Sequence, residues 1–118
     1  MRVLVTGARG FVGGHLLPRL AELGWRALGT ERDELDVADA EAVAAAVARE
    51  RPDAIVHLAA VSSAGAASRD PHLAFRVNFA GARNLLAAAS RHAPRARVLL
   101  VGSGEVYGPL ADDAAPFD

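Results

Sequence analysis

Three evenly spaced glycines that follow a short apolar run near the N-terminus constrain the fold of this chain more than any other feature. Residues 3–5 read V-L-V, a pattern typical of a buried strand that is covered on both faces in a parallel sheet. After such a strand, Gly7 would permit a tight turn, Gly10 would let the backbone approach a pyrophosphate, and Gly13 would let the next helix pack closely. The N–H groups at the positive end of that helix would face the anion. The pattern predicts a dinucleotide site; the alternative is a glycine turn with a structural role only.

Two charged residues at the end of the next expected strand, residues 26–30, bear on the identity of the dinucleotide. Glu31 lies near the offset of about 20 residues at which a carboxylate accepts hydrogen bonds from the ribose hydroxyls, which favours NAD. Arg32 could instead pair its guanidinium with the 2′-phosphate of NADP. Because the two residues are adjacent, the sequence leaves NAD and NADP open.

Helix and strand patterns alternate along the chain. The expected elements after the first strand are a helix at 11–23 ended by Gly24 with Val12, Leu16, Leu20 and Leu23 facing the core, a strand at 26–30, a helix at 40–51 capped by Asp39, a strand at 54–58, a loop at 59–69, a helix from Asp70-Pro71 to about 92, a strand at 98–102, and a loop to 118. Right-handed crossovers make this an α/β fold, a Rossmann-like doubly wound parallel sheet in spatial order 3-2-1-4, incomplete at its C-terminal end. A ligand of such a sheet lies at the carboxyl ends of the strands.

Composition excludes several classes of function. The 118 residues are 52% hydrophobic and 23% charged, which predicts a globular domain or part of one. The formal net charge of -1 provides no basic surface for nucleic acid or an anionic membrane. The sequence has no cysteine, which excludes a thiolate metal site and is compatible with a cytoplasmic location. The first apolar run is too short for a signal peptide or a membrane span, and no cluster with metal-ligand spacing is present.

Four segments occur in an order that is typical of one enzyme superfamily. Residues 6–13 read T-G-A-R-G-F-V-G, residues 57–60 read H-L-A-A, residues 77–78 and 84–86 read V-N and N-L-L, and residues 102–108 read G-S-G-E-V-Y-G. Together they resemble the motifs of the extended short-chain dehydrogenase/reductases, the nucleotide-sugar epimerase and dehydratase superfamily. Within it, residues 61–70 and 98–108 are most similar to GDP-4-keto-6-deoxy-mannose reductases and GDP-mannose 4,6-dehydratases.

This resemblance implies a set of binding residues. The expected contacts to NAD or NADP are Gly7, Arg9, Gly10, Phe11, Val12, Gly13, Glu31, Arg32, Asp36, Val37, Leu58, Ala59, Ala60 and Asn78. Asp36 and Val37 would meet the edge of the adenine, although a solvated loop explains them almost as well. The expected contacts to a nucleotide-diphosphate sugar, with a GDP-sugar favoured, are Val61, Ser62 and Ser63.

The resemblance also implies two catalytic side chains. Ser103 would hydrogen-bond the reacting oxygen of the substrate. Glu105 would be a general base in a dehydratase, whereas in a reductase it would only bind substrate or cap its loop. Tyr107 does not match the family's catalytic tyrosine, because a lysine stands four positions after that residue and Ala111 stands there in this chain, which contains no lysine. His57 is expected to be structural.

Residues 1–118 are therefore expected to form the N-terminal portion of an NAD(P)-binding Rossmann domain, without the substrate domain, of a nucleotide-sugar oxidoreductase of the 4-keto-reductase, dehydratase or epimerase type. Without the Tyr-Lys pair this stretch alone should be inactive, and its fourth strand should be an apolar edge that self-associates. The full-length protein is expected to be a homodimer, by resemblance. The alternatives are a non-catalytic NAD(P)-binding regulatory module and a remnant that binds no ligand.

Overall fold

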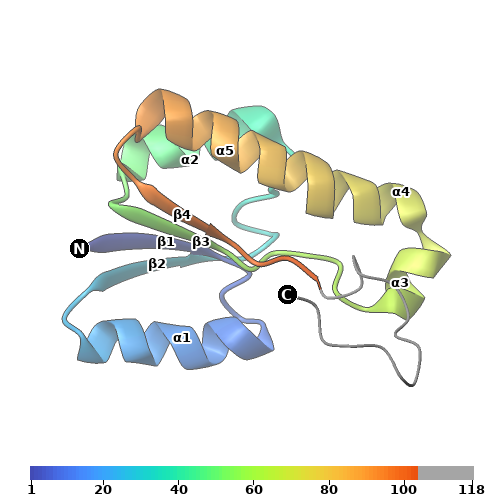
Figure 1. Ribbon diagram of the computed structural model, residues 1–118, viewed down its shortest axis with the longest axis horizontal. Coiled ribbons are helices and arrows are strands. Elements are labelled where there is room, and N and C mark those ends of the chain that lie inside the picture. The colour runs from blue at the N-terminus through green and yellow to red at the C-terminus, as the bar shows by residue number, and fades with distance from the viewer. Residues whose placement is uncertain (104–118) are drawn as a thin grey trace, which may run out of the picture.

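Four parallel strands form one sheet with helices on both faces (Figure 1). The structure, a computed structural model, describes residues 1–103. Its elements are β1 (Arg2–Thr6), α1 (Phe11–Glu22), β2 (Arg26–Thr30), α2 (Ala40–Glu50), β3 (Ala54–His57), α3 (Ala64–Arg69), α4 (Pro71–Ala74), the π-helix η1 (Phe75–Ala80), α5 (Gly81–His92) and β4 (Arg97–Leu100). The expected Rossmann-like parallel architecture is confirmed. The loop expected beyond residue 103 lies outside the described residues.

The order of the strands is β2-β1-β3-β4, so the expected order 3-2-1-4 is wrong. β3 pairs with β1, with Val3 opposite Ala54, and does not lie beyond β2. The right-handed crossover from β1 to β2 places α1 on one face of the sheet. The crossover from β2 to β3 runs in the opposite direction across β1, so it places α2 on the other face. Figure 1 shows this arrangement, with α1 on one side of the sheet and α2 and α5 on the other. The direction of winding therefore reverses between β1 and β3, and this is the switch point of the sheet.

The two faces of the sheet have separate hydrophobic cores. Val3 and Val5 point towards α1, where they form a cluster with Ala8 and Leu20. On the opposite face, Leu4 joins a larger cluster with residues of β3, α2 and α5, whose fully buried members are Val43, Val47, Ile55 and Leu85. β1 is therefore buried on both faces, as its continuous apolar run predicted.

Capping residues in the sequence predicted most helix ends correctly. Asp39 caps α2 by accepting hydrogen bonds from the N–H groups of Glu41 and Ala42. Asp70 caps α4, and Pro71 occupies the first turn. Gly24 ends the first helical segment with a φ of +70°. An N-terminal aspartate, a first-turn proline and a C-terminal glycine are each favoured at a helix terminus.

Three local expectations are corrected. Residues 59–69 are not all loop, because Ser63 accepts a hydrogen bond from the N–H of Ala66 and caps α3. Val12 in α1 and Leu23, which follows this helix, are exposed by 56% and 49%, whereas Gly13 and Leu20 are the buried residues of α1. The strands β3 and β4 also end earlier than expected, at His57 and Leu100.

Candidate functional site

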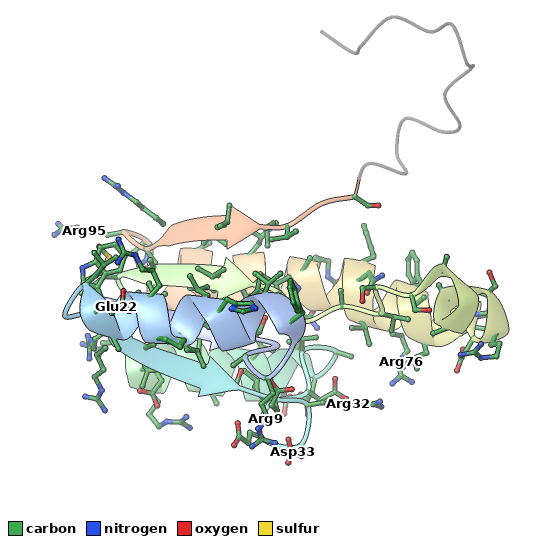
Figure 2. All side chains as sticks on the ribbon, turned by 90° about the horizontal axis from the view of Figure 1, so that it is seen from below. Arg9, Glu22, Arg32, Asp33, Arg76 and Arg95 are labelled. Atoms are coloured by element: carbon green, nitrogen blue, oxygen red, sulfur yellow. The ribbon has the colours of Figure 1, made fainter. Side chains whose placement is uncertain are left out.

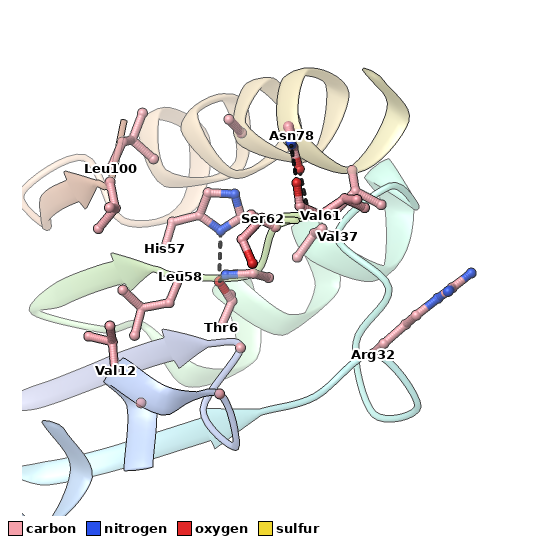
Figure 3. A pocket seen from close by; sticks show the side chains of 18 of the residues that line it. Thr6, Val12, Arg32, Val37, His57, Leu58, Val61, Ser62, Asn78 and Leu100 are labelled. Atoms are coloured by element: carbon pink, nitrogen blue, oxygen red, sulfur yellow. Dashed lines mark hydrogen bonds between the residues drawn. The ribbon is translucent and has the colours of Figure 1, made fainter. Parts of the chain in front are cut away.

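A cavity of about 800 Å³ opens at the carboxyl edge of the sheet, beside the ends of β1 and β3 (Figure 3). Its volume is within the range of small-molecule and cofactor sites, roughly 300–1,000 Å³. The expected site residues that line it are Gly7, Gly10, Phe11, Val12, Gly13, Glu31, Arg32, Asp36, Val37, Leu58, Ala59, Ala60, Val61, Ser62, Asn78 and Ser103. The cavity thus brings together residues that follow each of the four strands, at the switch point of the sheet.

The start of α1 faces this cavity and has no side-chain cap. Gly10 is the N-cap residue, and the first turn of α1 contains no acidic side chain. By contrast, Asp39, Ser63 and Asp70 each accept a first-turn N–H hydrogen bond at the start of α2, α3 and α4. The first-turn N–H groups of α1 are therefore left for another acceptor, and the helix dipole favours an anion there.

The three glycines of the turn have different roles. Gly7 has a φ of +70°, and a Cβ on it would lie 2.8 Å from the backbone nitrogen of Ala59. A Cβ on Gly13 would overlap the carbonyl group of Ala8. A Cβ on Gly10 would approach only the carbonyl oxygen of Gly7, at 3.2 Å, and Gly10 is exposed. Gly7 and Gly13 therefore allow close packing of the protein itself, whereas Gly10 leaves the backbone open towards the cavity.

The acidic loop after β2 forms one end of the site. Glu31 lines the cavity and accepts a hydrogen bond from the backbone N–H of Arg9. The Arg9 guanidinium lies 3.4 Å from Glu34 and 3.9 Å from Asp33, on the surface of the molecule (Figure 2). Arg9 is thus the one expected cofactor residue that does not line the cavity. Arg32 lines the rim, and its side chain extends away from the cavity (Figure 3).

Two asparagines of the long helical segment hold the walls in place. Asn78, in η1, accepts a hydrogen bond from the N–H of Val61 at 2.8 Å and donates one to the Val61 carbonyl at 3.1 Å (Figure 3). The buried Asn84, in α5, donates to the carbonyls of Val37 and Ala38 at 3.1 and 3.2 Å. Asn78 therefore fixes the loop after β3, and Asn84 fixes the loop before α2. The sequence signalled Asn84 only through its place in a motif.

A buried polar pair joins the ends of β1 and β3. The Thr6 hydroxyl lies 2.7 Å from Nδ1 of His57, and the backbone N–H of Ala59 donates to the same hydroxyl at 3.3 Å (Figure 3). Thr6 and His57 are 1% and 7% exposed. Burial lowers the pKa of His57 below its usual value, so the imidazole is neutral at pH 7. The contact with Thr6 links His57 to the end of β1, and His57 also lines the cavity.

Several lining residues were not predicted from the sequence. They are Thr6, Leu35, Leu73, Val77, Ala82, Leu100 and Val101. Strand alternation could have found Thr6, because it shares a face of β1 with Leu4. Helical spacing could have found Ala82, four residues after Asn78.

The expected substrate and catalytic residues are only partly in the cavity. Ser103 lines it, as do Val61 and Ser62. Ser63 lies outside the lining and caps α3. Glu105 lies outside the described residues. Within residues 1–103, no group of three potential ligands is placed to hold a metal ion, and no helix is long and apolar enough to cross a membrane.

Comparison with known proteins extends this description. The model of the NAD dependent epimerase/dehydratase family matches residues 3–118. GDP-6-deoxy-D-mannose reductase of Pseudomonas aeruginosa is 35% identical over 98% of this chain and 38% of its own length. UDP-glucose 4-epimerase of Thermus thermophilus, solved with NAD, has a TM-score of 0.89 and 29% identity over 100% of this chain and 43% of its own. RMD from Pseudomonas aeruginosa, solved with NADPH, has a TM-score of 0.82 and 34% identity over 99% of this chain and 39% of its own length. The chain therefore spans less than half the length of these relatives.

Proposed function

Because the chain belongs to the NAD dependent epimerase/dehydratase family, we propose that residues 1–118 are the N-terminal, dinucleotide-binding portion of an NAD(P)-dependent enzyme that modifies nucleotide sugars. The observation that carries this proposal is the uncapped start of α1, which faces a cavity of about 800 Å³ at the switch point of the sheet. A structural glycine turn would need neither the cavity nor the uncapped helix. Relatives that were solved with NAD and with NADPH support the choice of ligand.

The residues present fit such a cofactor. The first-turn N–H groups of α1 would bind the pyrophosphate, since Gly10 leaves room for its approach. Glu31 would accept hydrogen bonds from the adenosine ribose. Asp36 and Val37 would border the adenine, in a loop that Asn84 holds. When bound, the nicotinamide of the cofactor supplies or accepts a hydride.

A pair of glycine variants tests this proposal in the natural gene product. Gly10→Val should weaken binding of NADH and NADPH by at least about tenfold, because its side chain would stand over the helix start. The backbone tolerates valine there, since Gly10 has a φ of −66°. Gly14→Val is the matched control, because a Cβ on Gly14 meets no atom within 4 Å. Unchanged affinity in Gly10→Val, measured by calorimetric titration, would remove the central claim.

For the substrate, we propose a nucleotide-diphosphate sugar, with a GDP-linked 4-keto-6-deoxy sugar favoured. GDP-6-deoxy-D-mannose reductase supports this choice by its identity over almost the whole chain. Ser103 would hydrogen-bond the reacting oxygen, and Val61 and Ser62 would border the sugar. Ser63 and Glu105 stay candidates by resemblance alone. These residues do not distinguish a reductase from a dehydratase or an epimerase, so turnover assays on all three reactions are needed.

We propose that the catalytic proton donor is a tyrosine in sequence beyond residue 118. The intact mass of the natural gene product, with peptides mapped beyond Asp118, tests this directly. A longer product that contains Tyr-x-x-x-Lys supports the enzyme, whereas its absence would favour a regulatory module that binds the dinucleotide without turnover. We also place the enzyme in the cytoplasm, supported by the absence of cysteine.

We further propose that the full-length protein is a homodimer. Phe75 and Phe79 are 62% and 57% exposed, and their rings stack with centroids 4.9 Å apart. Leu86, 44% exposed, follows at helical spacing along the same segment. Exposed apolar side chains in a row of this kind mark a contact surface.

A further inference from the structure

The hydrogen bonds around Thr6 determine which nitrogen of His57 carries a proton. The hydroxyl of Thr6 accepts from the backbone N–H of Ala59 and is almost fully buried. Its own proton must therefore be donated to an acceptor, because an unsatisfied buried hydroxyl is costly. The atom within reach is Nδ1 of His57, at 2.7 Å. Nδ1 is thus the acceptor, which places the proton of the neutral imidazole on Nε2.

The Nε2 edge of His57 is turned towards the cavity. Figure 3 shows Nδ1 directed at Thr6 and the opposite edge of the ring directed towards the helical segment that carries Asn78. Among the described residues, the only fully buried side-chain polar atom that lacks a partner is Oγ1 of Thr30, so Nε2 reaches the cavity space. Among residues 1–103, none accepts a hydrogen bond from it. His57, only 7% exposed, thus presents one donor to the site.

We propose that Thr6 locks His57 in the Nε2–H tautomer, and that this N–H donates a hydrogen bond to a neutral oxygen, a hydroxyl or a carbonyl, of the bound dinucleotide. The ligand half of this inference rests on the proposed function. A neutral donor suits a neutral acceptor, whereas the phosphates would lie at the start of α1. His57 is then a binding residue and not an acid or base, because its second nitrogen is already engaged by Thr6.

Nitrogen-15 NMR of the histidines in the full-length gene product tests the tautomer without any ligand. The expected spectrum has Nδ1 unprotonated and Nε2 protonated at pH 7. In Thr6→Val, which removes the hydroxyl, this preference should weaken, and in Thr6→Ser it should persist. A proton on Nδ1 in the wild-type protein would overturn the assignment.

Substitutions at His57 separate the two ends of the ring. His57→Gln keeps an N–H donor near the position of Nε2, and His57→Asn keeps only an acceptor near the position of Nδ1. We expect NADH and NADPH to bind about five- to tenfold more weakly to His57→Asn than to His57→Gln, which is the effect of one net hydrogen bond. The surface residue His72 provides the control, His72→Asn, which should bind as the wild type does.

The outcomes distinguish this proposal from the proposed function. Addition of NADH should shift the Nε2–H signal and slow its exchange with water. If NADH binds and the signal does not move, or if His57→Asn binds as tightly as His57→Gln, the ligand half is wrong and the proposed function stands. If neither dinucleotide binds the wild-type protein, the proposed function and the ligand half both fail, and the NMR of the free protein still decides the tautomer.

Discussion

At the scale of single residues, Glu31 is the side chain that we expect to distinguish the two dinucleotides. Its carboxylate lines the cavity and is partly engaged by the backbone N–H of Arg9. The 2′-phosphate of NADP would replace the ribose hydroxyl that donates to a carboxylate and would also repel it. No guanidinium points into the described cavity to offset this repulsion, because Arg9 pairs with acidic neighbours and Arg32 extends away.

We therefore expect Glu31→Ala to weaken NADH binding roughly tenfold, as expected for a lost hydrogen bond to a charged group. NADPH binding should be unchanged or tighter. Glu34→Ala is the matched control, because Glu34 contacts Arg9 and the N–H of Glu31 but does not line the cavity. Titrations with both dinucleotides measure the effect, and equal losses for NADH and NADPH would count against a ribose contact.

At the scale of elements, the long helical segment from 71 to 92 positions two loops by two asparagines. The buried Asn84 donates to two carbonyl oxygens of the loop before α2, whereas the exposed Asn78 binds the loop after β3. In Asn84→Ala both carbonyls would lose a buried partner, so the free energy of unfolding should fall by about 1–3 kcal/mol. Asn78→Ala should cost less, because water can replace its bonds. Urea unfolding compares the two, and a larger loss in Asn78→Ala would contradict this account.

The helix ends and the strands were predictable because each depends on a few adjacent side chains. Asp39 and Asp70 have the N-cap chemistry that marks a helix start. The position of β3 beside β1 was not predictable from the sequence, because strand order depends on contacts between distant segments. One signal was present: β2 carries Arg26 and Gly29, which suit the edge of a sheet better than its interior. The π-helix η1 was not predicted, because the sequence indicated one continuous helix over this segment.

At the scale of the whole molecule, most of the site was predictable because the carboxyl ends of parallel strands meet at one edge whatever their order. The cavity consequently contains the expected residues after each strand, although β3 lies on the other side of β1. The sequence pattern did not predict the buried contact between Thr6 and His57. Both residues were expected to be strand residues, and their contact depends on the pairing of β1 with β3. β4 is an end strand of the described sheet, and its apolar residues Leu99 and Leu100 are exposed.

Two apolar surfaces of the described chain could mediate association, and substitutions separate them. If Phe75 and Phe79 form the dimer contact, the double variant Phe75→Ser/Phe79→Ser should be a folded monomer, because it removes two stacked exposed rings without touching either core cluster. Leu23→Ser, at another exposed apolar position, should leave the dimer intact. In residues 1–118 expressed alone, Leu99→Glu on β4 should reduce self-association, since a charge blocks edge pairing. Light scattering gives the mass of each; a dimeric double variant would show that the aromatic pair is not the interface.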